Sequence, residues 1–222
     1  MRPTVIAGPT GERSRSWTGR ARAGLAEKLP MENLLPDRQP YYVGSWIYVF
    51  GVATIAALVL TVLSGVILAQ AGPDWWHFSA AGRFFNSLHF WSVQLFFVFM
   101  VLHLWGQYFM ASWRGGRAPT WMIGVVIFAI SIVAAFTGYL SQQNFASQWI
   151  AVSAKDALNA TGFGAFFNVL NFGQMYGVHV ALLPAAIIGL VALHIVWVRL
   201  KGVVPPIDVM PAGTRPTPKK VR

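Results

Sequence analysis

Four histidines lie inside apolar stretches of the sequence, where an ionisable side chain is costly and is by default a candidate for function. His89 and His103 share one stretch, and His179 and His194 share another. The members of the first pair are fourteen residues apart and those of the second fifteen. On a helix these separations are close to four turns, or ~21–22 Å, so both histidines of a helix face nearly the same way.

Two helices that each present two histidines at matched heights can hold two flat macrocycles, one above the other. A neutral imidazole is a common axial ligand of haem iron. A single intramembrane histidine can instead bind a neighbouring helix through a hydrogen bond, but two matched pairs disfavour that interpretation. We therefore predict two bis-histidine haem sites, with these iron ligands: His89 with His179, and His103 with His194.

Two pairs of glycines repeat the same period on the other apolar stretches. Gly51 and Gly65 are fourteen residues apart, as are Gly124 and Gly138. A glycine opposite a haem removes the side chain that would collide with the porphyrin, although close helix packing uses glycine too. Because the two periods coincide, we predict that Gly65 and Gly138 face the haem of His89, and that Gly51 and Gly124 face the other haem.

The elements that carry these residues are long enough to cross a membrane. The chain has 222 residues, of which 55% are hydrophobic and only 11% charged. A spanning helix needs about 20 apolar residues. Four stretches meet this requirement, and none has an Asp, Glu, Lys or Arg well inside it: Trp46–Gln70, Phe84–Ala111, Thr120–Leu140 and Gln174–Val198. The predicted fold class is an all-α membrane protein, a bundle of four transmembrane helices.

The cationic residues predict the orientation of this bundle. In a four-span arrangement, fifteen of the seventeen Lys and Arg residues fall on one side, which is the cytoplasmic side by the positive-inside rule. Both termini are then cytoplasmic, and the net charge of +10 reflects topology rather than nucleic-acid binding. His77 follows Trp75 and Trp76 in a loop and is predicted to lie at the membrane interface.

Three regions are expected along the chain: an N-terminal segment over residues 1–44, the bundle over 45–202 and a basic, Pro-rich tail over 203–222. Trp17, Ala21 and Leu25 recur at helical spacing and suit a helix on the cytoplasmic interface. The link over residues 141–171 is long enough to have local structure of its own. The chain has no cysteine, which excludes Cys-ligated clusters and covalent haem.

The pattern resembles the cytochrome b of quinol–cytochrome c reductases, most closely the short cytochrome b6 form, over roughly residues 45–206. The histidine and glycine pairs carry the resemblance, together with "PTWMIGV", "FTGYL" and "HVALLP". It implies two non-covalent b-type haems and an exchangeable quinone or quinol. It also implies a homodimeric complex in a bacterial-type energy-transducing membrane, with a Rieske iron–sulfur protein, a subunit IV-like or C-terminal cytochrome b partner and a c-type cytochrome.

The sequence departs from the family at the arginines that usually neutralise haem propionates. The three positions hold Asn86, Gly106 and Gln174, and a Pro-Trp-Gly-like motif is replaced by Ser141–Asn144. Four other arginines are candidate substitutes at the ends of the spans: Arg83, Arg114, Arg117 and Arg199.

Three functions are compatible with these residues. The first is a cytochrome b6-like subunit that passes electrons across the membrane between quinol and quinone sites and is inactive alone. With the termini cytoplasmic, His89 and His179 form the outer pair, and by resemblance the haem there has the lower potential. The second is a dihaem membrane anchor that links the quinone pool to a peripheral oxidoreductase. The third, a haem-free helical scaffold or transporter, is the least favoured.

Overall fold

The computed structural model describes residues 17–29 and 46–204, and the regular elements in these ranges are all helices. The chain divides into two units, Met1–Gln39 and Pro40–Arg222. The described part of the first unit is helix α1, Trp17–Lys28, with Trp17 and Leu25 exposed. A helix therefore forms where helical spacing was noted, while its place on a membrane surface stays a prediction. The Pro-rich tail from residue 205 lies outside the described residues.

Four helical segments of the second unit are long and apolar enough to cross a membrane. The first three are α3 (Trp46–Ala71), α5 (Ala80–Phe109) and α6 (Ala118–Leu140). The fourth runs over Phe172–Lys201 and has three parts: α8 (Phe172–Gly177), a π-helical turn (Val178–Leu182) and α9 (Leu183–Lys201). The all-helical fold class with four candidate spans is confirmed.

Local sequence explains where the spans begin. Helix α5 starts at Ala80, before the expected Phe84, because the Ser79 side chain accepts a hydrogen bond from the Gly82 backbone N–H at 2.8 Å. Helix α6 starts at Ala118 with Pro119 in its first turn, where a missing N–H costs nothing. Hydropathy alone does not locate such caps, since capping residues are polar and lie outside the apolar run.

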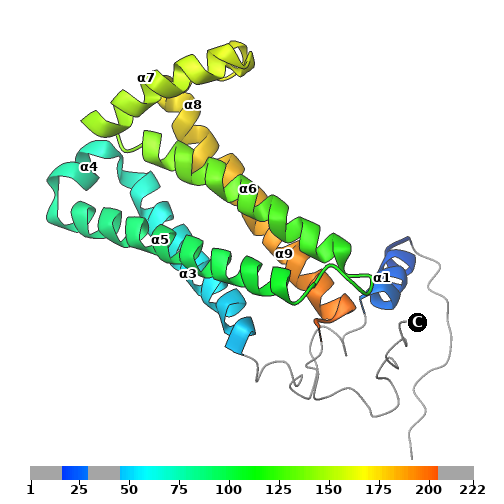
Figure 1. Cartoon of the computed structure of the whole chain (residues 1–222). Helices are drawn as coiled ribbons and strands as arrows, with labels where there is room; N and C mark the ends of the chain where they lie inside the picture. The colour runs from blue at the N-terminus through cyan, green and yellow to red at the C-terminus, as the bar shows by residue number, and fades with distance from the viewer. Residues whose placement is uncertain (1–16, 30–45, 205–222) are drawn as a thin grey trace, which may run out of the picture. The chain divides into compact units, whose positions relative to one another are not determined.

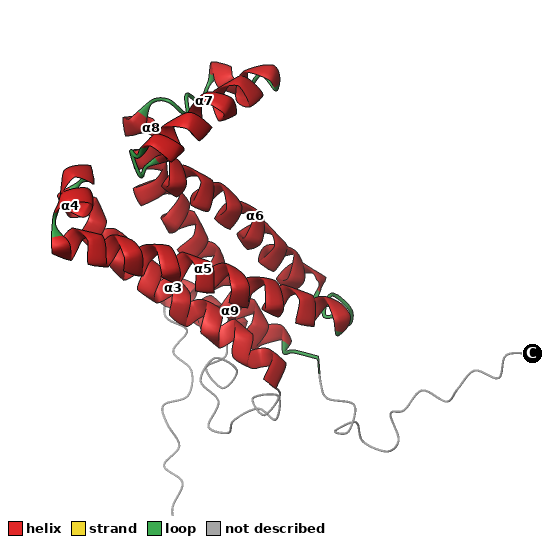
Figure 2. Cartoon of the chain, turned by 60° about the vertical axis from the view of Figure 1, so that its left-hand side comes forward, coloured by secondary structure: helices red, strands yellow, loops and turns green. Residues whose placement is uncertain are grey.

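The spans are arranged as two helix pairs, α3 with α5 and α6 with α9 (Figure 1). Helix α5 runs antiparallel to α3, and the short turn after it returns the chain into α6. The short helix α4 (Pro73–Phe78) lies at the same end of the bundle as α7 (Phe145–Ala160) and α8, as both views show (Figures 1 and 2). The opposite end carries the turn between α5 and α6.

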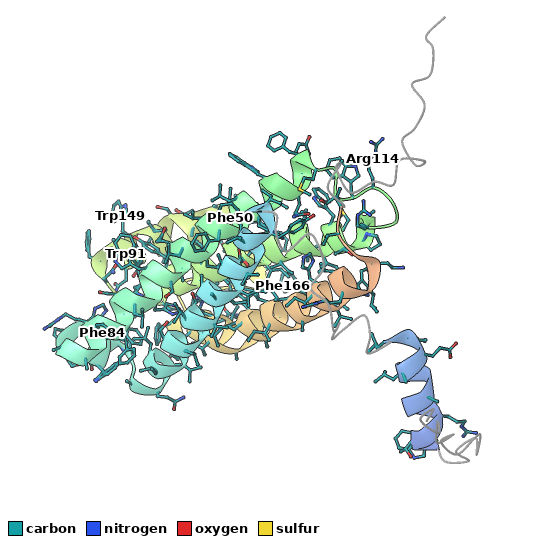
Figure 3. The ribbon with its side chains drawn as sticks, turned by 90° about the horizontal axis from the view of Figure 1, so that it is seen from below. Phe50, Phe84, Trp91, Arg114, Trp149 and Phe166 are labelled. Carbon is teal, nitrogen blue, oxygen red and sulfur yellow. The ribbon has the colours of Figure 1, made fainter. Side chains whose placement is uncertain are left out.

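The long link over residues 141–171 is structured. Asn144 caps α7 by accepting from the Ser147 backbone N–H at 2.9 Å, and the Ser147 hydroxyl pairs back with the Asn144 backbone. A 3₁₀ turn, Phe163–Ala165, follows. Several aromatic side chains of this region are exposed, including Trp149 and Phe166, which Figure 3 labels together with Phe84 near the start of α5 and Arg114 in the turn after it.

Apolar and hydroxyl residues fill the interior of the bundle. One cluster of buried residues lies about midway along the helices: Ala57, Phe96, Met100 and Ile127. Buried hydroxyls such as those of Ser64 and Thr137 donate to carbonyls of their own helices at 2.7 and 3.1 Å, so these buried donors are satisfied. Large apolar side chains such as Trp91 and Leu63 point outward, as expected for a bundle that lipid surrounds.

Candidate functional site

The structure brings the four intramembrane histidines together in the two predicted pairs. The rings of His89 on α5 and His179 on the π turn have centroids 6.3 Å apart and are nearly perpendicular, at 87°. His103, further along α5, and His194 on α9 are close enough to interact electrostatically. We name these the 89/179 pair and the 103/194 pair.

Three of the four rings are oriented by a backbone carbonyl. The Nδ1–H groups of His89, His179 and His194 donate to the carbonyls of Thr61, Ala134 and Thr120 at 3.0, 2.9 and 3.0 Å. A carbonyl oxygen can only accept, so each Nδ1 carries the proton and each Nε2 keeps its lone pair. This arrangement is typical of a histidine whose Nε2 ligates a metal.

Each predicted glycine lies against the ring of one of these histidines. A Cβ added at Gly65 would lie 3.1 Å from Cε1 of His89, and one at Gly51 would lie 3.1 Å from Cε1 of His103. At Gly138 it would overlap the His179 ring, 2.9 Å from Nε2, whereas at Gly124 it would make an ordinary contact of 3.5 Å with His194. Each glycine contacts a histidine of the pair to which the sequence assigned it, so an added side chain would meet the imidazole. Its place opposite a haem stays a prediction.

The glycines also expose the carbonyls that orient the rings. In a helix the side chain of residue i leans toward the preceding turn and covers the carbonyl of residue i−4. The three accepting carbonyls stand four residues before a glycine: Thr61 before Gly65, Thr120 before Gly124 and Ala134 before Gly138. Each glycine thus makes room for the ring and uncovers its acceptor.

The π turn accounts for the unequal spacing of the two histidine pairs. Val178–Leu182 is π-helical and contains His179, and Pro184 follows in the first turn of α9. A π turn accommodates one extra residue in an otherwise α-helical segment. Fifteen residues with this insertion rotate the chain about as far as fourteen do in a regular helix, so His179 and His194 face one direction as His89 and His103 do.

The residues of the 89/179 pair fit a haem iron. Two metal–nitrogen bonds of about 2 Å, with about 1 Å from each nitrogen to its ring centre, give a centroid separation of roughly 6 Å. In residues 17–29 and 46–204 no three His, Asp or Glu side chains gather in one place. Haem requires no such cluster, because its macrocycle supplies the remaining ligands.

His103 is the exception among the four rings. Its Nδ1 is buried and has no hydrogen-bond partner among the described residues. By the relation seen at the other three sites, its acceptor would be the carbonyl of Ile47, four residues before Gly51. A buried donor without an acceptor is rare, and it identifies this ring as the least constrained of the four.

The neutral residues at the family's arginine positions are all engaged. The Asn86 and Gln142 side-chain amides exchange two hydrogen bonds, at 3.3 and 3.1 Å. At Gly106 a Cβ would collide with the Ile47 side chain of α3, so a larger residue there requires Ile47 to move. Gln174 accepts a hydrogen bond from the Asn168 backbone at 2.8 Å and so stabilises the chain before α8.

The four candidate arginines lie at the ends of the spans. Arg83 is exposed and donates to the Phe78 carbonyl at 3.4 Å. Arg114, in the turn after α5, and Arg199, in the last turn of α9, are exposed as well. Only Arg117 has a buried guanidinium nitrogen, its Nε, which is without a partner among the described residues. Their role toward haem propionates stays a prediction.

Sequence reasoning missed the groups that orient the histidines. The accepting atoms are backbone oxygens, and the side chains of Thr61, Thr120 and Ala134 give no sign of this role. Ser64 was missed too, although its hydroxyl lies 3.1 Å from Nδ1 of His89. The available signal was the glycines themselves, because each one points to the carbonyl four residues earlier.

Comparison with known families and proteins follows the same residues. Residues 94–218 match the family model described as "Cytochrome b(N-terminal)/b6/petB". This range includes three of the four histidines: His103, His179 and His194. The chain is 25% identical over 190 residues to the menaquinol:cytochrome c reductase cytochrome b subunit of Bacillus subtilis, covering 75% of this chain and 85% of that one. It is 26% identical over 210 residues to the cytochrome b6 of Heliobacterium modesticaldum, covering 82% and 99%.

A solved structure has the same fold. A chain of a "Hyperthermophilic respiratory Complex III" superposes with a TM-score of 0.63 at 19% sequence identity. The match covers 89% of this chain, which spans 57% of the length of the other.

Proposed function

The chain belongs to the cytochrome b(N-terminal)/b6 family of integral membrane proteins, and from this premise we propose that it is the dihaem electron-transfer subunit of a quinol-oxidising complex. The 89/179 pair would hold one non-covalent b-type haem and the 103/194 pair the other. The single observation that carries the proposal is that the histidines face each other in pairs, with three rings fixed by carbonyls and their Nε2 atoms left to bind iron.

The protein would hold each haem in place, and the haem would supply the redox chemistry. Each bound haem would supply a one-electron iron couple. The bundle fixes the two histidine pairs ~21 Å apart along α5. Between the two levels lie Phe96, Met100 and Ile127, and none of the buried residues there is ionisable. An apolar layer without titratable groups suits the passage of electrons that are not accompanied by protons.

The relatives suggest the substrate and the partners. One is named a menaquinol:cytochrome c reductase subunit, so we propose a quinol as electron donor and a quinone as acceptor near the other membrane face. The partners would be a Rieske protein, a subunit that supplies the C-terminal part of cytochrome b, and a c-type cytochrome, in a homodimeric complex. Residues 45–202 would form the haem-binding region between two cytoplasmic terminal segments.

Purification of the tagged chain from its native membrane in mild detergent tests this function. A reduced-minus-oxidised spectrum with two b-type haems per chain, together with co-purified Rieske protein, is expected. A preparation without haem would refute the proposal. Two haems accompanied by a peripheral dehydrogenase, with no Rieske protein, would instead establish the membrane-anchor function, which the missing Pro-Trp motif over residues 141–144 keeps as the second candidate.

The orientation has its own test, because the chain has no cysteine that would give a background. Ser153→Cys on the exposed face of α7 and Arg114→Cys in the turn after α5 lie at opposite ends of the bundle. In intact cells an impermeant maleimide should label Ser153→Cys and not Arg114→Cys. The reverse pattern would place the termini outside.

A further inference from the structure

A hydrogen-bonded cluster of polar side chains lies at the end of the bundle next to the 89/179 pair. It joins three elements: the short helix α4, the start of α5 and the turn after α6. The side-chain amides of Asn86 and Gln142 donate to each other, with N–O distances of 3.3 and 3.1 Å. His77 of α4 donates from Nε2 to the backbone carbonyl of Gln142 at 2.6 Å. We name Asn86, Gln142 and His77 the amide clasp.

The two amides are next to the two halves of the haem site. Asn86 lies three residues before His89, on the same face of α5. Gln142 lies four residues after Gly138, which contacts the His179 ring, and five after the wholly buried Thr137. The clasp therefore connects the helix that carries one histidine to the helix that receives the other.

The turn that carries Gln142 is constrained on both sides. The Ser141 hydroxyl donates to the Thr137 carbonyl at 2.8 Å, and Gln143 has a positive φ of 56°, which L-residues rarely adopt. Asn144 then caps α7. Because the backbone leaves little freedom at residue 142, its side chain can fix the height of Asn86, and with it that of His89.

The two amides of the clasp are joined by hydrogen bonds and carry no charge. The nearest arginine in sequence, Arg83, is exposed and donates to the Phe78 carbonyl instead. The reciprocal pair uses one N–H and the carbonyl oxygen of each amide, and because both groups are uncharged the contact needs no counter-ion in an apolar setting.

We propose that the amide clasp is the positioning device of the 89/179 haem site: it fixes the register of α5 against α6 so that His89 and His179 stay opposite each other. The proposal rests on the proposed function, since it requires a haem at this pair. Its residues are positioning residues that act through the two histidines and through Gly138. The 103/194 pair, at the far end of α5, has no part in the clasp and provides an internal reference.

The test uses the holoprotein with both haems. The haem of the 89/179 pair is first identified as the one lost in His89→Ala. Asn86→Leu and Gln142→Leu should then each increase the rate at which this haem transfers to apomyoglobin by about five-fold, the factor for one neutral hydrogen bond. The same variants should shift the low-spin EPR signal of this haem and leave that of the other unchanged.

Two further variants make the result specific to the pair. The double variant Asn86→Leu/Gln142→Leu should transfer this haem no faster than either single variant, because the two substitutions break the same interaction. The exchange Asn86→Gln/Gln142→Asn keeps the summed length of the two side chains and should restore the wild-type signal. Gln94→Leu, on the exposed face of α5, is the matched control and should change neither haem.

The outcomes separate this proposal from the proposed function. A wild-type protein without haem contradicts the proposed function itself. A different result would overturn the clasp alone. In that case the wild-type protein binds two haems, the single variants have unchanged EPR signals, and their effects on the rate of haem transfer add in the double variant. If the leucine variants fail to accumulate, the exchange variant decides: a wild-type signal supports the clasp, and loss of the 89/179 haem overturns it.

Discussion

Substitution of the four glycines by alanine gives a graded test of how the histidine rings are placed. The structure ranks the sites by the contact of the added Cβ: it overlaps the His179 ring at Gly138, is tight at 3.1 Å at Gly51 and Gly65, and is unstrained at 3.5 Å at Gly124. The damage to haem binding should follow this order, with Gly138→Ala the most severe and Gly124→Ala the least.

Two opposing terms set the magnitude. Overpacking a well-filled site costs ~1–3 kcal/mol, and alanine in place of glycine within a helix contributes about 0.5–1 kcal/mol of stability. At Gly138 three ring atoms lie within reach of the new methyl group, so the cost is near the upper limit and the net loss is ~2 kcal/mol, about 30-fold in haem affinity. At Gly124 the packing cost vanishes, and the variant should be equal to or slightly more stable than the wild type.

Redox titration followed in the visible spectrum measures the occupancy of each haem, and a thermal melt of the same samples measures stability. Gly138→Ala should lose the haem of the 89/179 pair and retain the other. Equal losses in Gly138→Ala and Gly124→Ala, or two intact haems in Gly138→Ala, would refute the assignment of these glycines to the histidine rings. The wild-type chain and Gly189→Ala, where an added Cβ meets nothing within 4 Å, are the controls.

Further predictions concern ligation, attachment and packing. His89→Ala and His103→Ala should remove different haems in a redox titration, and loss of the same haem in both would contradict the pairing. Acidified acetone should extract all haem, because no cysteine can retain it; colour left on the polypeptide would contradict non-covalent binding. Gly106→Arg should lower the melting temperature because the Ile47 side chain fills its space, and Ile47→Ala should partly reverse the loss. Deletion of Val180 should convert the π turn to an α turn and retain both haems, whereas an added alanine there should rotate His179 by about 100° and remove one.

The sequence sufficed for the spans and for the pairing of the histidines, because both depend on period and hydropathy. Four apolar runs identify four helices to within four residues at each end. The nearly equal spacing, fourteen and fifteen residues, gives two matched levels, and the parallel direction of the second and fourth spans places His89 opposite His179.

The sequence did not predict the hydrogen bonds that orient the site, because these depend on backbone atoms and on contacts between distant residues. The oxygen that orients His89 is the main chain of Thr61, and any residue at that position would provide it. The pairing of Asn86 with Gln142 joins positions 56 residues apart, and only the arrangement of α5 against the turn after α6 brings them together. The sequence indicated a steric role for the glycines, but it did not indicate their contacts with the imidazole rings.

The π turn has a consequence for how relatives of this chain are aligned. At Val178–Leu182 the π turn contains one extra residue that does not increase the distance between the two histidine levels. Residue number and depth in the membrane are therefore no longer proportional there. A relative with fourteen residues between its last two histidines and one with fifteen can therefore build the same site. An alignment that forces a gap elsewhere in this helix would misplace every lipid-facing residue between the gap and the bulge by about 100°.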